Sequence, residues 1–413
     1  MIMQDNEKKP ALRFKGFTDP WEQRKVGDHL IPSKLPGHTG VDARKLTVKL
    51  WGKGVVEKTD SYGGSEHTQY YVRHAGQFMY GKLDFLHAAF GIVPAELDNY
   101  ESTLDSPAFD LSEINGKFLV SRVCKEDFYL KYGTIANGSR KAKRIHEDTF
   151  MDMPILVPEL EEQERVAALL EALDTLITLH QRKYEKLVNI KKSMLDKMFP
   201  QNGASVPEIR FKGFTDPWEQ RKLAELTKTI TTGKSVNSDE GEVSDGDIGV
   251  LKTSCVSYDR FNSSESKPVV KSEQQLVKCA VEKDSVIVSR MNTPERVGAC
   301  GYVSTDFPNL FLPDRLWKLK FQDTVDTYFV YMMLVSSAYK EKITSMASGT
   351  SGSMYNIPKE TFLNLQLVIP AKIDEQKQLG KILKKIDTLI TLHQRKLEKL
   401  QNIKKSCLEK MFV

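Results

Sequence analysis

The sequence lacks the features that direct a chain to a membrane, to an oxidising compartment or to metal chemistry. Its five cysteines are odd in number and form no Cys-x-x-Cys pair, so we expect reduced thiols in a cytoplasmic protein. No apolar run approaches the roughly 18 residues of a membrane span, and the first ten residues lack the apolar core of a secretion signal. The eight histidines show no metal-ligand spacing. A net charge of +5 permits a nucleic-acid partner without requiring one.

Two short motifs approximate functional signatures but are incomplete. Residues 231–235, Thr-Thr-Gly-Lys-Ser, match the end of a phosphate-binding loop, but Lys228 stands where that loop needs its first glycine. We therefore expect no nucleotide site there. Thr-Asp-Pro-Trp at 18–21 and 215–218 lacks the second proline of the amino-methyltransferase motif, and no glycine-rich cofactor turn precedes it. We interpret it as part of a linker that buries Trp21 and Trp218.

A unit of about 200 residues occurs twice in the chain. Residues 13–25 recur without change at 210–222, and of the 37 positions at 163–199, 24 are identical at 376–412. The intervening stretches, 26–157 and 223–369, show no comparable resemblance to each other. We call the repeated segments, 13–25 with 163–199 and 210–222 with 376–412, the frame, and the unlike stretches 26–157 and 223–369 the inserts. The chain therefore repeats its frame and varies its inserts.

The segment at 163–199 and its copy have the heptad pattern of coiled-coil helices. Steps of four and three separate the seam positions of the first copy, which are Val166, Leu170, Leu173, Ile177, His180, Tyr184, Leu187, Lys191, Met194 and Met198. Because domain termini usually lie close together, we expect the two helices to pair antiparallel, with a pseudo-twofold axis near His180 and His393. We hypothesise that these histidines meet across the axis and fix the register; the alternative is ordinary half-solvated packing.

The inserts have the composition of mixed α/β domains. Residues 281–289 and 365–369 are predicted strands, and 328–342 is a predicted helix. We expect an α+β fold with two mixed α/β domains, separated by a long antiparallel two-helix coiled coil with internal pseudo-twofold symmetry. The expected bounds are 1–158 for the linker peptide and first domain, 159–199 for the first helix, 200–370 for the linker repeat and second domain, and 371–413 for the second helix.

This arrangement resembles the specificity (S) subunit of type I restriction-modification systems. The resemblance rests on the duplicated Arg-Phe-Lys-Gly-Phe-x-x-x-Trp-Glu linker, the Pro-x-x-x-Glu-Gln helix start, and paired helices ending in Lys-Met-Phe. It covers nearly the whole chain. It implies two target recognition domains that each read one half of a split, asymmetric DNA sequence, and helices that set the spacing and dock two methyltransferase subunits.

The same resemblance implies that the chain has no active site and binds no cofactor. Adenine methylation and ATP-dependent DNA cleavage would belong to methyltransferase and restriction subunits, which would carry S-adenosylmethionine, ATP and Mg. A coiled-coil scaffold that joins two protein-binding domains without touching DNA is the alternative. A self-sufficient methyltransferase is a third possibility.

Candidate DNA contacts are predicted in both inserts. Residues 131–144 contain five basic residues and no acidic one, which suits phosphate contacts, although a solvated basic turn has the same composition. Residues 348–356 take the matching position in the second insert, and 290–296 follow a predicted strand, where a structural salt bridge is an equal alternative. The candidates are Lys34, Lys131, Asn137, Ser139, Arg140, Lys141, Lys143, Arg144, Lys234, Arg290, Asn292, Arg296, Ser348, Thr350, Ser351 and Ser353. Asn137 and Arg140 are the candidate base readers.

Polar residues outside the helical seam are also repeated. Thr178, Gln181 and Arg182 recur as Thr391, Gln394 and Arg395, although the seam itself tolerates Leu, Ile and Met exchange. A recent duplication would produce this, but the unlike inserts argue against one. We therefore interpret these six residues as a surface that each helix presents to one of two identical partners.

Overall fold

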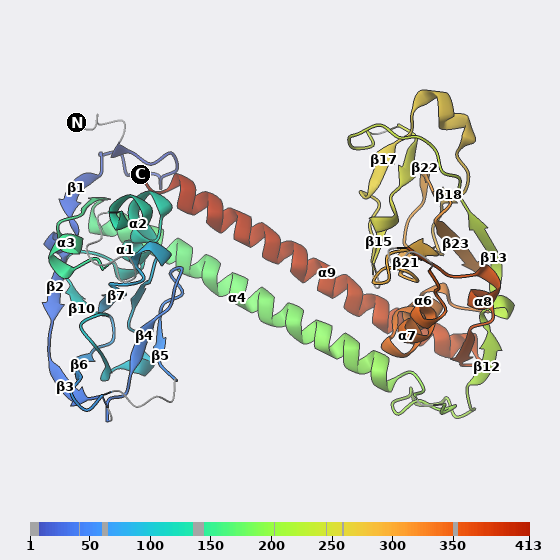
Figure 1. The fold of residues 1–413 in the computed structure, drawn as a ribbon, viewed down its shortest axis with the longest axis horizontal. Coiled ribbons are helices and arrows are strands. Elements are labelled where there is room, and N and C mark those ends of the chain that lie inside the picture. The colour runs from blue at the N-terminus through green and yellow to red at the C-terminus, as the bar shows by residue number, and fades with distance from the viewer. Residues whose placement is uncertain are drawn as a thin grey trace. The chain divides into compact units, whose positions relative to one another are not determined.

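The computed structural model describes residues 8–40, 42–59, 65–134, 144–201, 203–244, 246–257, 260–349 and 354–413. The chain divides into two compact units, of which the first combines Met1–Gln181 with Arg395–Val413 and the second is Arg182–Gln394. Each unit contains one mixed α/β domain and parts of two long helices. These helices are α4 (Leu160–Lys197, green in Figure 1) and α9 (Ile373–Lys410, red). The predicted mixed α/β content is confirmed.

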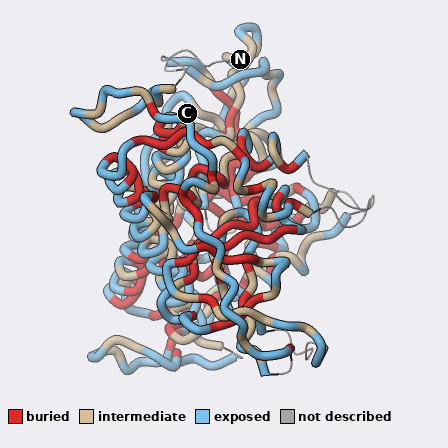
Figure 2. The backbone as a smooth tube through the Cα atoms, turned by 90° about the vertical axis from the view of Figure 1, so that its left-hand side faces the viewer, coloured by how far each residue is buried: buried red, intermediate tan, exposed pale blue. Residues whose placement is uncertain are grey.

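A four-stranded antiparallel sheet organises the domain of the first unit. Its order is β2-β10-β7-β8, from β2 (Leu30–Ser33), β10 (Ala108–Leu111), β7 (Phe78–Tyr80) and β8 (Phe90–Ile92). Smaller sheets join β3 (Pro36–Thr39), β6 (Gln69–Arg73) and β9 (Tyr100–Ser102), then β4 (Leu46–Val48) and β5 (Val55–Glu57), and finally β1 (Glu22–Lys25) and β11 (Pro154–Val157). Its helical elements are η2 (Val26–His29), η3 (Phe85–His87), η4 (Ala95–Leu97), α1 (Gly116–Val123), α2 (Glu126–Gly133) and α3 (Glu147–Met151). Figure 2, in which this unit faces the viewer, shows buried residues concentrated toward the centre of the view.

The domain of the second unit contains a sheet of the same size. Its order is β13-β23-β19-β21, from β13 (Thr227–Thr232), β23 (Leu316–Phe321), β19 (Ser285–Ser289) and β21 (Cys300–Val303). A further sheet joins β17 (Ser266–Pro268), β14 (Gly249–Leu251), β22 (Phe307–Phe311) and β18 (Ala280–Val281). The paired strands are β12 (Glu219–Lys222) with β25 (Gln366–Ile369), β15 (Val256–Ser257) with β16 (Arg260–Phe261), and β20 (Met291–Asn292) with β24 (Tyr355–Asn356). Its other helical elements are α5 (Leu223–Leu226), η5 (Thr253–Cys255), η6 (Lys271–Leu276), α6 (Thr327–Val335), α7 (Ser337–Ser345) and α8 (Lys359–Leu363).

The sheets β2-β10-β7-β8 and β13-β23-β19-β21 share one topology. If the strands of each sheet are numbered along the chain, their order across the sheet is first, fourth, second, third. In both domains, the fourth strand is followed along the chain by a pair of helices. The inserts therefore have a common core topology although their sequences show no comparable resemblance. Sheet order depends on contacts between residues far apart in the chain, so sequence periodicity did not predict it.

Two predicted elements of the second insert are wrong in extent. The single strand predicted at 281–289 is two strands in different sheets, because Asp284 adopts a left-handed φ of 52° and turns the chain between β18 and β19. The single helix predicted at 328–342 is interrupted at Ser336, whose extended backbone (φ −66°, ψ 151°) ends α6 and caps α7. The strand predicted at 365–369 is confirmed as β25.

A repeated tryptophan lies at the centre of each frame. Trp21 is 1% exposed, with its ring 5.6 Å from that of Phe118 and 6.1 Å from that of Phe412. Trp218 is 3% exposed, between Phe329 (5.8 Å) and Phe199 (6.2 Å). The prediction that the linker buries both tryptophans is confirmed. In each unit a phenylalanine from the insert and one from the Lys-Met-Phe end of a long helix enclose the indole.

A buried ion pair joins the linker peptide to the start of a long helix in each unit. The Arg13 guanidinium donates from Nε to Glu162 Oε1 (2.7 Å) and from its terminal nitrogen to Oε2 (2.8 Å). Arg210 binds Glu375 in the same way, at 2.6 and 2.8 Å. The two glutamate side chains are only 1% and 2% exposed. Each of these acids therefore has a buried bidentate arginine partner.

The glutamine that follows each of these glutamates connects the frame to the insert. Gln163 accepts a hydrogen bond from the Asn115 backbone N–H (2.9 Å) and donates one to the Pro158 carbonyl (2.9 Å). Gln376 accepts from the Asp326 N–H (3.0 Å) and donates to the Pro370 carbonyl (2.9 Å). Asn115 and Asp326 are the N-caps of α1 and α6, and their side chains accept from the N–H of Phe118 and Phe329. Frame and insert therefore meet through the same contacts in both units.

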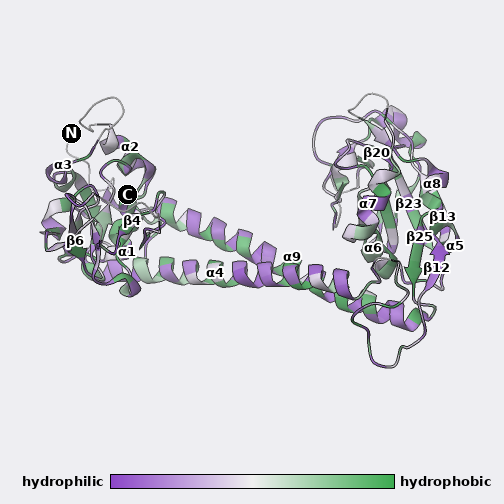
Figure 3. Cartoon of the chain, turned by 60° about the horizontal axis from the view of Figure 1, so that its bottom comes forward, coloured by the Kyte–Doolittle hydropathy of each residue, from purple (hydrophilic) through white to green (hydrophobic). Residues whose placement is uncertain are grey.

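Within each unit the long helices run antiparallel. In the first unit, Leu170 near the start of α4 shares an apolar cluster with Met411 beyond the end of α9, and Asp174 forms an ion pair with Lys404. In the second, Met198 beyond the end of α4 shares a cluster with Leu379 and Leu383 near the start of α9. There Lys191 lies 2.8 Å from Asp387. Figure 3 shows the alternation of apolar and polar residues along both helices. The hypothesis that His180 meets His393 concerns residues of different units and stays a prediction.

Candidate nucleic-acid interface

Two separately predicted segments of the second domain lie side by side. β20, which contains Asn292, pairs antiparallel with β24, and the backbone of Ser348 exchanges two hydrogen bonds with that of Asn356 (3.1 and 2.9 Å). The N–H of Ile357 also donates to the Arg290 carbonyl at 2.9 Å. Among the described residues, 290–292 therefore lie beside 355–357, and Ser348 lies beside Asn356.

The side chains of these segments differ in their availability. Arg290 is half-buried and donates from Nε to the Asp314 carbonyl (2.7 Å), and Asn292 is 8% exposed and bonded to Ser289 and the Thr293 N–H. These two residues support the turn in this conformation. Arg296 and Ser348 are exposed. Within the described part of the chain neither Arg290 nor Arg296 forms an ion pair, so the alternative of a structural salt bridge gains no support.

In the first domain, three of the basic candidates lie within the described residues. Lys131 is exposed on α2, with its Nζ 5.1 Å from the Tyr132 ring centroid, and Arg144 forms a 3.2 Å ion pair with Asp105. Lys34 directly follows β2 and lies 3.4 Å from Glu147. Lys234 follows β13, the corresponding strand of the second domain, and is exposed. The remaining candidates lie outside the described residues; they are Asn137, Ser139, Arg140, Lys141, Lys143, Thr350, Ser351 and Ser353.

A buried charge network beside Lys34 was not predicted. Burial tends to raise the pKa of Glu147, but hydrogen bonds and charge from Lys82 and Lys34 outweigh it and hold that pKa below its usual range. Glu147 therefore stays ionised and orients Lys34 as well as Lys82, which lies 2.8 Å away. Arg73 is fully buried, and burial lowers its pKa to about 10, so it remains charged at neutral pH. These residues belong to no motif, and only the fold brings them together.

The repeated polar residues of the long helices lie beside exposed leucines. Thr178 and Arg182 on α4 are exposed and Gln181 is half-buried, and the same holds for Thr391, Arg395 and Gln394 on α9. Among them, Leu176 and Leu179 are 41% and 44% exposed, and their copies Leu389 and Leu392 are 42% and 44% exposed. Sequence reasoning considered only seam leucines and missed these four. Each helix thus presents the same apolar and polar residues outside the seam.

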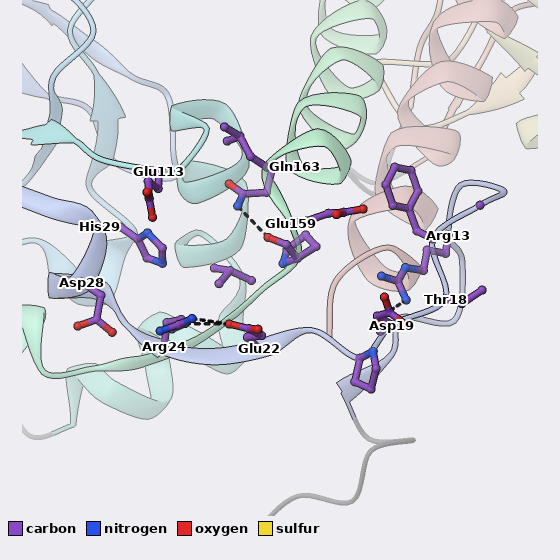
Figure 4. Close-up of a pocket in the computed structure, with 16 residues that line it drawn as sticks. Arg13, Thr18, Asp19, Glu22, Arg24, Asp28, His29, Glu113, Glu159 and Gln163 are labelled. Carbon is purple, nitrogen blue, oxygen red and sulfur yellow. Dashed lines mark hydrogen bonds and ion pairs between the residues drawn. The ribbon is translucent and has the colours of Figure 1, made fainter.

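A cleft of about 600 Å³ lies beside the linker peptide of the first unit (Figure 4). Its arginines are already engaged: Arg13 binds Glu162 and the Asp19 carbonyl (2.6 Å), and Arg24 binds Glu22 (2.6 Å). His29 Nδ1 lies 3.2 Å from the Ser112 carbonyl oxygen, so Nδ1 carries the proton and donates it. Thr18 supplies the one lining hydroxyl, and within the described residues no hydrogen bond links it to His29. The lining groups thus hold the frame together and form no nucleophile–base pair.

No group of three or more His, Cys, Asp or Glu side chains in the described part of the chain is arranged to hold a metal ion. No helix there is long and apolar enough to cross a membrane.

Residues 215–402 match the family model of the type I restriction modification DNA specificity domain. Two specificity subunits of Methanocaldococcus jannaschii are similar to the chain: that of type I restriction enzyme MjaVIII, 25% identical over 287 residues, and that of the putative enzyme MjaX, 25% identical over 286 residues. Each alignment covers 68% of this chain, and it spans 65% and 63% of the two relatives, slightly less than two thirds of their length.

The fold is also found in a solved structure. The crystal structure of a type I restriction-modification system S subunit from M. genitalium superimposes with a TM-score of 0.64, covering 98% of this chain and 99% of that chain at 13% identity. At this identity the likeness shows the fold alone. Together these matches confirm the resemblance to specificity subunits that the repeats and motifs indicated.

Proposed function

We propose that the chain is the DNA-reading specificity subunit of a type I restriction-modification complex. One observation carries the proposal: two domains of the same core topology and unlike sequence are held by the same frame contacts, Arg13–Glu162 in one unit and Arg210–Glu375 in the other. A frame that is constant around two different readers suits a target with two unlike halves. Each domain then recognises one half of a split, asymmetric DNA sequence.

The second domain contacts its half-site through residues of the segments 290–296 and 348–356. The exposed Arg296 and Ser348 are the direct candidates there, and Arg290 and Asn292 support the turn that carries them. In the first domain the candidates are Lys34, Lys131 and Arg144, together with those among residues 137–143. The positive charge of the lysines and arginines suits phosphate contacts, which fix orientation before base edges are read.

The long helices form an antiparallel coiled coil with pseudo-twofold symmetry. The repeated ion pairs Asp174–Lys404 and Asp387–Lys191 support this part of the proposal, because each joins an aspartate of one helix copy to the same lysine position of the other. The repeated exposed residues near Leu179 and Leu392 receive two methyltransferase subunits. Catalysis, S-adenosylmethionine, ATP and Mg belong to those partners and to the restriction subunits, and this chain is non-catalytic.

The test is co-expression with the cognate methyltransferase subunit, followed by genome-wide mapping of methylated bases. A split motif is expected. Replacing Arg296 with alanine should alter only one half of the motif, and replacing Lys131 with alanine should alter only the other. A complex that forms but modifies no DNA would contradict the proposal and would favour the scaffold that joins protein-binding domains.

A further inference from the structure

A basic cleft of about 640 Å³ lies in the second unit, between α9, the start of α6 and the strands β13 and β23. None of its lysines was a candidate from the sequence. The lysines that line it are Lys228, Lys283, Lys320, Lys377, Lys381 and Lys384, and the acidic residues are Asp284, Asp323 and Asp326. Six ammonium groups around three carboxylates give the cleft a positive potential.

Most of these lysines are available to a ligand. Four of them, Lys228, Lys283, Lys377 and Lys381, are exposed and form no ion pair with any described residue. Lys320 forms an ion pair with Glu282. Lys384 Nζ lies 3.3 Å from the Tyr302 hydroxyl and 5.0 Å from the centre of that ring.

Two of the three aspartates are already engaged within the protein. Asp284 accepts the Tyr302 hydroxyl, and Asp326 accepts the Phe329 N–H at 2.8 Å. Only Asp323 has no such contact among the described residues. These contacts hold two of the carboxylates in place without removing their charge, and the six lysines still outnumber the three aspartates that line the cleft.

The backbone is irregular where it meets the cleft. Lys228 occupies a β-bulge: the register of β13 against β23 shifts between Thr227 and Thr229, so Lys228 is the extra residue. Lys283 precedes Asp284, which holds a left-handed φ of 52°. Bulges and left-handed non-glycine residues re-aim side chains and concentrate at functional sites. Here both of them bring a lysine to the same cleft.

The first unit has a corresponding cleft without this charge. It has a volume of about 460 Å³ and is lined by Asn115, the counterpart of Asp326, with Lys117 and Glu171 as its charged groups. In the helix repeat, Lys377, Lys381 and Lys384 correspond to Glu164, Ala168 and Glu171. The frame therefore does not require these lysines, because the first copy is built without them. Their charge is a property of the second unit alone.

We propose that this lysine cleft binds backbone phosphate groups of the DNA that the second domain reads. The inference rests on the proposed function. Lysine ammoniums on flexible stems contact phosphates without reading bases, which suits an orienting role. A nucleotide cradle would instead present the backbone N–H groups of a glycine-rich loop, and the one lining glycine, Gly380, lies within α9.

The experiment measures binding of the full chain to a fluorescent duplex of about 40 base pairs that contains the mapped target, at salt concentrations from about 50 to 300 mM. The test variant combines Lys228→Gln, Lys283→Gln, Lys377→Gln and Lys381→Gln. The charge-matched control combines Lys222→Gln, Lys271→Gln, Lys278→Gln and Lys359→Gln, which are exposed in the same unit and do not line the cleft. Circular dichroism and hydrogen exchange establish that both variants fold.

The wild-type chain should bind with a steep salt dependence. In the test variant, the slope of log K against log salt should fall by about 0.9 for each lost phosphate contact, so by roughly 2 to 4 in all. The control should change the slope by less than about 1, and the methylated motif should stay the same.

The outcomes separate the two proposals. A wild-type chain with no salt-dependent DNA binding contradicts the proposed function itself. A steep wild-type slope that the test variant leaves unchanged overturns the cleft assignment alone. The test variant could instead keep the wild-type slope but lose binding of ATP or tripolyphosphate, measured by calorimetry. That result overturns the cleft assignment in favour of a small phosphate ligand. If the test variant keeps the wild-type slope but assembles more weakly with the methyltransferase subunit, the cleft assignment is overturned in favour of an acidic protein segment as the ligand.

Discussion

The buried pairs Arg13–Glu162 and Arg210–Glu375 allow a matched prediction. Glu162→Ala leaves the Arg13 guanidinium, 14% exposed, without its bidentate partner. Removing one member of a buried ion pair typically costs about 3 to 5 kcal/mol, and the partial exposure of the arginine places this case near 3 kcal/mol. Amide exchange through opening of β1 and β11 should then accelerate roughly 150-fold, since 1.36 kcal/mol corresponds to a factor of ten.

Glu375→Ala should have the larger effect. Glu375 Oε1 also accepts the Trp218 indole N–H at 3.2 Å, whereas the Trp21 indole N–H has no partner among the described residues. Both variants remove the same side-chain volume, so the difference between them isolates that hydrogen bond. A bond to a charged acceptor is worth about 1.5 to 3 kcal/mol, which is at least a further tenfold acceleration in β12 and β25.

Hydrogen–deuterium exchange with mass spectrometry resolves the two units separately. Glu161→Ala and Asp374→Ala, at exposed neighbouring positions, are the controls and should change exchange by less than about threefold. Equal effects of Glu162→Ala and Glu375→Ala would refute the role of the indole bond. Effects no larger than the controls would refute the claim that the ion pairs hold the linker peptides in place.

Three further predictions concern packing and charge. Phe412→Ala should destabilise the first unit by about 3 to 5 kcal/mol, because the Phe412 ring packs at 5.2 Å from that of Phe118. Amide exchange in the second unit should stay unchanged, and an equal loss of stability in both units would contradict this. Gly233→Ala should lower the unfolding temperature of the second unit, measured by calorimetry, because a Cβ there would lie 1.5 Å from the Leu312 carbonyl oxygen. An unchanged unfolding temperature would refute that contact. Burial tends to raise the pKa of Asp174, but hydrogen bonds and charge from Lys117 and Lys404 hold it below its ordinary 3.8. The stability it contributes should therefore be complete above that pH and be lost as pH falls through the lower folded pKa. In denaturant titrations followed by circular dichroism, Asp174→Asn should remove this pH-dependent part, and an identical pH dependence in both proteins would count against it.

Sequence reasoning succeeded where the signal is local or repeated. The two long helices follow from the heptad spacing, and the burial of Trp21 and Trp218 followed from their place in an unchanged linker. The turn of the chain at Asp284 gave no such signal in the sequence, because the left-handed backbone conformation of an aspartate depends on its hydrogen bonds and on its neighbours in the fold. The role of Gly233 could not be predicted from the sequence either. This glycine allows close packing against Leu312 and does not bind phosphate.

The lysine cleft was missed for a different reason. The identical positions of the helix repeat drew attention to Thr178 and its copies, whereas Lys377, Lys381 and Lys384 are positions at which the two copies differ. Comparing the copies for differences in charge would have found three of the six lysines. The other three come from strands and a turn of the insert, and only the fold brings them to α9.

The hydrogen bonds of Gln163 and Gln376 set a short list of conditions for any domain that could occupy this frame. At the position of Asn115 or Asp326 the domain must supply a backbone N–H, which excludes proline, and a short side chain that can accept a hydrogen bond. Three residues later it must supply a phenylalanine to cover the tryptophan of the linker. The rest of the domain is left free by these contacts. A new reader could therefore evolve or be installed with these two positions constrained, and its sequence preference would be free to change.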